Sequence, residues 1–509
     1  MRMNIVNIMN FVRGCEPRFE IDLVEPVRQE LALCRKYDLP NTFLFQYDAL
    51  VREDLVSIVK GAPKTEVGVW LEMARCLTEK VGIPWRGREG YDWDWYVDPG
   101  FLPSYTQEER ARLIDEIMRL FKEIFGEYPR SAGSWVIDAF SMEYMEKKYG
   151  VKAFGICREE WAVDAYTLQG GYYNQGYYPS RLNNLCPAQT RENQINAPVF
   201  RLLGPCPVFN YGLHWYEGEY ETPPTIEPCS QMGTEPQVVR WFFDNYFHNE
   251  SLAFSYIQLG QENSFGWEGI KKGLPMQFEI LDEYVKSGQC QVMTMGDTGE
   301  WFQTRFDRTP ATSLIADSNP LTGTIDNSVW YDCVNYRANL VTENGRLYFR
   351  DIYKFREDYV ESCYDQPCRG WQITYDNLPV MDGYLWRRED DNRAGIYFDG
   401  QLQSFRTFRD GDSLVAEAVL SGKTVRIEMA EKGIIVFIDG SLRFSKKPGE
   451  ELTFSDTAIR GTHKGYAYEV GVSGRCSADG VIAPENGKIV LDMTRRSLDN
   501  PLPPVLYFP

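Results

Sequence analysis

The stretch NIVNIMNF at residues 4–11 decides the fold. It is an apolar run of the length of a buried strand, and the segment 21–37 that follows carries Leu23, Val27, Leu31 and Cys34 at helical spacing. Parallel strands need a crossover between them, and an amphipathic helix is the usual one. The beginning of the chain therefore predicts an α/β protein.

The same alternation of strand and helix continues to about residue 305. Further strands are predicted at 42–47, 66–73, 132–137, 152–157, 198–203, 252–259 and 291–295, with helices at 107–125 and 140–149. Seven or eight such units close into a barrel, for which about 250–300 residues is the usual size. We therefore predict a (β/α)8-type barrel over residues 1–308.

After residue 309 the pattern changes to short alternating segments. GRLYFR at 345–350, TVRIE at 424–428 and GIIVFI at 433–438 lie between Gly, Asp and Asn residues, which is typical of antiparallel strands and turns. The polar junction before them contains Pro310 and Pro320, which suits a domain boundary. The prediction is a C-terminal β-sandwich domain over residues 309–509.

Composition excludes several classes of protein. The chain has 509 residues, of which 43% are hydrophobic and 25% charged, and its formal net charge of −19 opposes binding to nucleic acid or to anionic membranes. The 12 cysteines have neither zinc-site nor disulfide-framework spacing, which favours free thiols in a reducing compartment. We expect the apolar N-terminal segment to be a first strand and not a signal peptide, and no apolar run reaches the roughly 18 residues of a membrane span. We expect a cytoplasmic protein.

The sequence also predicts no metal and no cofactor. A metal-dependent deacetylase on such a barrel needs an Asp with a closely spaced histidine pair, and His214, His248 and His463 are too scattered to supply it. No glycine-rich phosphate-binding motif follows a strand. The expected chemistry is therefore one that side chains can perform alone.

Carboxylates follow several of the predicted strands. Barrel active sites lie at the carboxyl ends of the strands, and cleavage of a glycosidic bond needs one acid and one base there. Glu16, Asp138 and Glu262 are the candidate catalytic residues. Asp138 also suits the N-cap of the next helix, whereas Glu16 and Glu262 have weaker structural explanations.

Two loops at the same end are rich in aromatic residues. YDWDW at 91–95 offers indole faces for sugar rings and carboxylates for their hydroxyls, although it would also suit a plug that closes the barrel mouth. GGYYNQGYYPSR at 170–181 has the composition of an ordered binding loop or a structural Ω-loop. Arg13, Arg130, Arg158 and Arg201 lie near strand ends and could bind the carboxylate of an acidic ligand, although pairing with a neighbouring Asp or Glu would also explain each of them.

Several segments resemble glycoside hydrolase family 156, a group of bacterial enzymes. The similar runs are IMNFVRG at 8–14, GSWVIDA at 133–139, GYYNQ at 171–175, PAQT at 187–190, PVFR at 198–201, SVWYD at 328–332 and YRANL at 336–340. The resemblance implies a barrel followed by β domains, an inverting exo-sialidase and a homodimer. It also implies that Arg130 and Arg201 hold the sialic-acid carboxylate and that Asp332 takes the place of an asparagine.

The chain departs from this family at its catalytic residues. The family has an aspartate as general base after strand one, where this chain has Glu16, and a histidine on strand four, where SAGSW at 131–135 contains none. Either Asp138 replaces that histidine as the acid or the chemistry differs. The leading hypothesis is a glycoside hydrolase that cleaves a terminal, acidic sugar from a glycan, and the alternative is an inactive sugar-binding protein on the same barrel. The predicted substrate-binding residues are Asn10, Arg13, Asp48, Trp95, Arg130, Trp135, Tyr173, Asn174, Arg201, His214 and Asp332.

Overall fold

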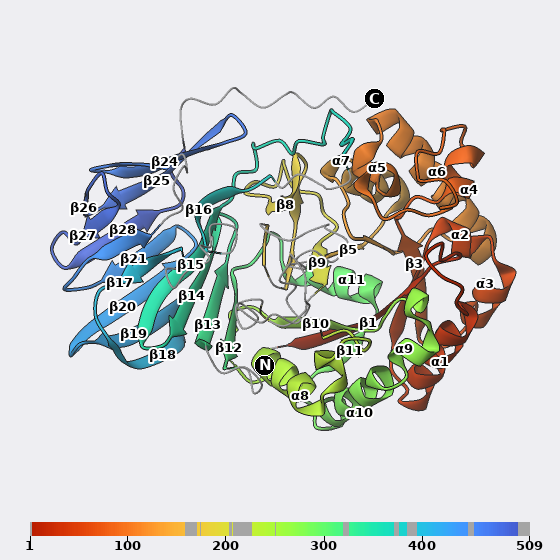
Figure 1. Cartoon of the computed structure of the whole chain (residues 1–509), viewed down its shortest axis with the longest axis horizontal. Helices are drawn as coiled ribbons and strands as arrows, with labels where there is room; N and C mark the ends of the chain where they lie inside the picture. Colours follow the sequence, from red (N-terminus) through yellow and green to blue (C-terminus); the bar gives the residue numbers. More distant parts are fainter. Residues whose placement is uncertain are drawn as a thin grey trace.

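The computed structural model of the chain divides into an α/β part and an all-β part (Figure 1). The α/β part is red to green in the figure and lies at the right, and the antiparallel strands at the left are teal to blue. The structure describes residues 3–157, 171–173, 175–202, 206, 226–249, 251–318, 325–370, 376–383, 394–445 and 452–496. Within these ranges, no helix has both the length and the apolar character needed to cross a membrane.

Eight parallel strands form a nearly closed, barrel-like sheet. Seven of them run in the order β10-β1-β2-β3-β4-β5-β9, and the eighth, β11, pairs with β1. A ninth strand, β6, pairs with β9 in the antiparallel direction. They are buried because helices cover the outside, which explains their nearly continuous apolar runs. The bounds are β1 (Asn4–Val12), β2 (Asn41–Phe45), β3 (Thr65–Trp70), β4 (Ser131–Ser134), β5 (Ala153–Cys157), β6 (Gly176–Tyr177), β9 (Val199–Leu202), β10 (Ser255–Leu259) and β11 (Gln291–Met293).

The eighth strand lies at a different place from that in a closed barrel. A (β/α)8 barrel has its eighth strand between the seventh and the first, but here β10 pairs directly with β1. Strand β11 pairs with the first half of β1, on the edge of β1 opposite to β10. Strand β2 pairs with the second half of β1 on the same edge as β11. In the described residues β9 and β10 do not pair. The predicted barrel is therefore confirmed in outline, and the order of its strands differs from that of a regular (β/α)8 barrel.

The helices cover the sheet with amphipathic faces. In α6, the side chains of Leu113, Ile117 and Phe121 are buried, and a capping box of Thr106 and Glu109 begins the helix. The helices are α1 (Val24–Lys36), α2 (Tyr47–Leu50), α3 (Glu53–Val59), α4 (Arg75–Lys80), α5 (Val97–Gly100), α6 (Gln107–Phe125), α7 (Ala139–Tyr149), α8 (Pro236–Phe247), α9 (Gly266–Ile270), α10 (Gly273–Lys286) and α11 (Met295–Arg305). The predicted helix at 107–125 is confirmed at both ends.

The C-terminal part consists of antiparallel sheets, as predicted. The first contains β12 (Thr312–Asp317), β13 (Ile325–Asp332), β14 (Tyr336–Glu343), β15 (Arg346–Lys354), β16 (Leu378–Asp382), β17 (Gly395–Phe398), β22 (Leu442–Ser445), β26 (Arg475–Cys476) and β27 (Val481–Ala483). The second contains β18 (Leu402–Asp410), β19 (Ser413–Leu420), β20 (Lys423–Ala430), β21 (Gly433–Phe437), β23 (Thr453–Ser455), β24 (Ala458–His463), β25 (Tyr466–Ser473) and β28 (Lys488–Asp492). Side chains of both sheets form one apolar core. The domain boundary at 308/309 stays a prediction.

The first of these sheets also packs against the barrel. Trp330 and Tyr348 belong to the same apolar cluster as Trp70 and Phe254 of the barrel. The small hairpin of β7 (Pro179–Ser180) and β8 (Asn183–Pro187) lies at this junction, since the carboxylate of Glu361 accepts hydrogen bonds from the backbone of β8 and of α7. The barrel and the sheet β12–β16 therefore share a continuous interface.

Candidate functional site

A buried cluster of three charged residues lies at the carboxyl ends of the strands. Arg13 follows β1, Glu72 follows β3 and Glu262 follows β10. The Arg13 guanidinium donates from Nε and Nη2 to the two oxygens of Glu72, each at 2.9 Å. Its Nη1 donates to Oε1 of Glu262 at 2.8 Å. One guanidinium thus joins two carboxylates from different strands.

Burial changes the pKa of a carboxyl group in this cluster. The pKa of Glu72 is raised because its carboxylate is desolvated, and the charge of Glu262 raises it further, whereas Arg13 opposes both effects. The Ser264 hydroxyl donates to Oε1 of Glu262 at 2.6 Å. Among the described residues, no three His, Cys, Asp or Glu side chains are grouped as metal ligands would be. The single positive charge of Arg13 is shared between the two carboxylates.

Glu16 belongs to a second ion pair beside the first. Arg18 donates from Nε to Oε1 of Glu16 at 2.7 Å and from Nη2 to Oε2 at 2.5 Å. Burial would lower the pKa of Arg18, but the hydrogen bond and the charge of Glu16 outweigh burial and raise it. The Arg18 guanidinium also lies 5.3 Å from the ring centroid of Trp93, and that of Arg13 lies 4.0 Å from the same centroid. The structure therefore brings Glu16 and Glu262 into one electrostatic cluster.

The aromatic loop at 91–95 covers this cluster. Trp93 is fully buried, and the Arg13 guanidinium lies 4.0 Å from the centroid of its ring. Trp95 is only partly buried, with Arg18 at 5.5 Å and Arg88 at 4.0 Å from its ring. The burial of Trp93 suits a plug of the barrel mouth, whereas the sugar-binding role of Trp95 stays a prediction.

Three further predicted residues lie around the same end of the barrel. The side-chain oxygen of Asn10 accepts a hydrogen bond from the Gln261 backbone at 3.3 Å. Asp48 is buried in α2, and this burial raises the pKa of its carboxyl. Trp135 packs edge-on against Trp70, with 6.1 Å between ring centroids. Asn10 and Trp135 thus support the ends of β10 and β3, and Asp48 follows β2.

Asp138, a predicted catalytic acid, has a structural role. It is the N-cap of α7, and its Oδ1 accepts from the Ser141 backbone at 2.9 Å. Its Oδ2 accepts from the Ser141 hydroxyl at 2.7 Å, and Arg110 donates to Oδ1 at 3.0 Å. Because capping and this ion pair use both oxygens, we leave Asp138 out of the candidate site.

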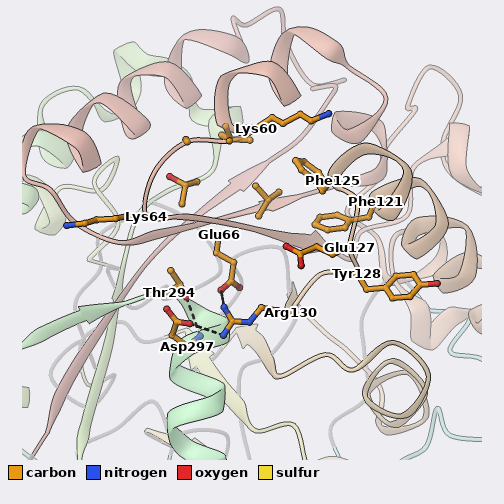
Figure 2. Close-up of a pocket in the computed structure, with 15 residues that line it drawn as sticks. Lys60, Lys64, Glu66, Phe121, Phe125, Glu127, Tyr128, Arg130, Thr294 and Asp297 are labelled. Carbon is orange, nitrogen blue, oxygen red and sulfur yellow. Dashed lines mark hydrogen bonds and ion pairs between the residues drawn. The ribbon is translucent and has the colours of Figure 1, made fainter.

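Arg130 lies at the opposite end of the barrel. It precedes β4, so the strand direction places it at the amino ends, where Figure 2 shows it pointing toward Asp297 and Glu66. Its Nη2 donates to Oδ1 of Asp297 at 2.8 Å and lies 3.1 Å from a carboxylate oxygen of Glu300. A cavity of about 550 Å³ adjoins these residues. The structure does not bring Arg130 together with Glu16 or Glu262.

Tyr173, Arg201 and Asp332 come together at the junction with the β domain. The Tyr173 backbone N–H donates to Oδ1 of Asp332 at 2.8 Å, and Arg201 donates to the Tyr172 carbonyl at 3.1 Å. Desolvation raises the pKa of Asp332 to about 8, although the Tyr173 N–H and nearby arginines oppose this shift. Tyr173 stacks on Trp330 at 3.6 Å and is buried. Asn174 and His214 lie outside the described residues.

Glu72, Arg18 and Trp93 are not among the predicted site residues. Glu72 directly follows the apolar run of β3, and a carboxylate in that position lies at the carboxyl end of the barrel. Its position after the strand is therefore the sequence feature that identifies it as a candidate. Nothing in the sequence indicates that Arg13 would bind it, since the two residues are joined only by the closing of the sheet. Pairing of distant loops is a tertiary property.

Comparison with known proteins shows a shared fold. No family model and no curated protein matches this chain. A candidate glycoside hydrolase/deacetylase from Parabacteroides distasonis has a TM-score of 0.53 and 15% identity, over 75% of this chain and 89% of that one. A candidate polysaccharide deacetylase from Mycobacterium smegmatis has a TM-score of 0.37 and 10% identity, over 60% and 93%. A GH57-type branching enzyme from Pyrococcus horikoshii has a TM-score of 0.33 and 9% identity, over 60% of this chain and 70% of that one. Only the first likeness is strong enough to support a common fold.

Proposed function

We propose that this chain is a glycoside hydrolase with Glu16 and Glu262 as its acid/base pair. The observation that carries the proposal is the convergence of these two carboxylates, each beside an arginine, at the carboxyl end of the barrel. Cleavage of a glycosidic bond needs two such groups, one to protonate the leaving oxygen and one to activate water or attack the sugar. The description of the Parabacteroides structure as a glycoside hydrolase/deacetylase supports this class of substrate.

The charges favour different tasks for the two residues. Arg18 holds Glu16 through both carboxylate oxygens, and we assign Glu16 the role of general base. The cluster of Arg13, Glu72 and Glu262 has two carboxylates for one guanidinium, so uptake of one proton makes it neutral. The Glu262 side chain is 6% exposed and that of Glu72 is 0% exposed. We assign delivery of the proton to Glu262 and positioning of Arg13 to Glu72.

We further propose that the sugar is terminal and acidic. The partly exposed guanidinium groups of Arg18 and Arg88 would bind its carboxylate, and the ring of Trp95 would pack against its apolar face. The resemblance to family 156 supports a sialoside as substrate, and the proposal of a homodimer rests on that resemblance alone.

Proton NMR with an aryl α-sialoside tests the proposal directly. The wild-type protein should release free sialic acid, and Glu262→Gln and Glu16→Gln should each lower turnover by about 10²–10⁴-fold. Glu30→Gln is the matched control, because Glu30 is a fully buried carboxylate in α1 that belongs to neither ion pair of the candidate site, and it should leave turnover unchanged. Equal rates in wild type and Glu262→Gln would refute the assignment.

A second candidate function is sugar binding without cleavage. It is favoured by the ion pairs and the burial of Glu16 and Glu262, which restrain both carboxylates. Titration calorimetry with sialyllactose, followed by NMR of the same sample, separates the two functions. Binding heat with an unchanged NMR spectrum would support the binding protein.

A further inference from the structure

Exposed apolar side chains are concentrated beside the candidate site. Among the described residues, four large hydrophobic side chains are exposed: Phe19 at 50%, Val51 at 56%, Phe265 at 39% and Phe437 at 38%. The first three follow β1, β2 and β10, which are neighbours in the sheet, whereas Phe437 lies on β21 of the β domain. An apolar patch next to a polar site is typical of a binding surface.

The three loops contact one another. Arg52, which follows Val51, donates to the Gly14 carbonyl of the loop after β1 at 2.8 Å. Asn263, near Phe265, donates to the Arg13 carbonyl at 2.9 Å. A Cβ atom added to Gly266 would lie 2.6 Å from the Ile21 side chain, so these loops are packed without space between them. Phe19 and Phe265 therefore belong to one rim beside Glu262.

Guanidinium groups alternate with aromatic rings along this rim. Arg18 lies 5.5 Å from the ring of Phe19 and 5.5 Å from that of Trp95. Arg88 lies 4.0 Å from the Trp95 ring and 4.1 Å from that of Tyr91. Aromatic faces pack on the C–H faces of sugars, and guanidinium groups bind carboxylates. The net charge of −19 opposes binding to an extended anionic membrane, whereas two guanidinium groups between aromatic rings suit a single acidic glycan.

We propose that Phe19 and Phe265 bind the sugar units next to the one that is cleaved. The natural substrate is then an oligosaccharide that extends across the rim, and not a small glycoside. This inference rests on the proposed function, because it places the scissile bond beside Glu262. It adds a specificity surface formed by the loops after β1 and β10.

The experiment compares two substrates in three proteins. Wild type, the double variant Phe19→Ala/Phe265→Ala and the control Phe437→Ala are assayed on 3′-sialyllactose and on an aryl α-sialoside. The control residue Phe437 is 38% exposed, close to the 39% of Phe265. The Lys488 ammonium lies 5.7 Å from the ring centroid of Phe437, and the Arg18 guanidinium lies 5.5 Å from that of Phe19, so both rings are next to a cation. We expect the double variant to lose about tenfold or more of kcat/KM on sialyllactose, with the aryl sialoside unchanged. An equal change on both substrates, or on neither, overturns the proposal.

Binding measurements separate failure of this inference from failure of the proposed function. If no protein hydrolyses either substrate, titration of 3′-sialyllactose by calorimetry still tests the rim. Binding by wild type and Phe437→Ala that the double variant loses supports it, and absence of binding by wild type overturns it. Binding to phosphatidylcholine vesicles that needs both phenylalanines would overturn it in favour of a lipid surface.

Discussion

At the scale of single residues, Arg13 determines whether the candidate site can exist. Its guanidinium is the partner of two buried carboxylates, so its removal would leave Glu72 and Glu262 uncompensated. We expect Arg13→Leu to lower the free energy of unfolding by about 3–5 kcal/mol, because breaking a buried ion pair costs more than the pair contributes. Urea denaturation of both proteins measures this difference.

A triple variant provides the control for this prediction. Arg13→Leu combined with Glu72→Leu and Glu262→Leu removes the charges together, and apolar replacements of a buried network are often neutral or stabilising. We expect it to regain most of the lost stability. A triple variant as unstable as Arg13→Leu would show that lost packing, and not unpaired charge, causes the effect.

At the scale of elements, two helix caps predict different costs. Thr106 caps α6 at an exposed position, and its replacement by alanine should cost about 1 kcal/mol. Asp138 caps α7 in the interior and also pairs with Arg110, so Asp138→Ala should cost more. Chemical denaturation of both variants gives the comparison. Equal costs would mean that the Arg110 ion pair contributes nothing to stability.

At the scale of the whole molecule, the junction of barrel and β domain should be sensitive to pH. Burial raises the pKa of Asp332 to about 8, whereas an unfolded aspartate titrates near about 3.9. Between these values the folded state keeps a proton that the unfolded state has released. The contribution of Asp332 to the free energy of unfolding therefore falls as pH rises from 5 to 7.

Asp332→Asn isolates this contribution. The amide keeps an oxygen for the Tyr173 N–H but does not titrate, so the variant should lose less stability than wild type between pH 5 and pH 7. Urea denaturation at the two pH values measures the difference. Parallel losses in the two proteins would contradict a raised pKa at Asp332.

Individual elements of the barrel follow from local sequence. The helix at 107–125 is fully specified by a capping box, an apolar stripe at helical spacing and Gly126 at its end. The strands at 4–11 and 42–47 lie within a residue or two of β1 and β2. The place of β11 beside β1 was not predictable, because strand order depends on which edges pair and not on the apolar pattern of the strand.

The sequence alone determined that Glu16, Glu262 and the loop at 91–95 lie at the same end of a barrel. That follows because parallel strands have their carboxyl ends at one edge. Only the tertiary structure decided their partners: Glu16 binds Arg18, Glu262 shares Arg13 with Glu72, and Asp138 caps a helix instead. The physical reason is that burial and ion pairing depend on contacts between loops far apart in the chain, which no local pattern records.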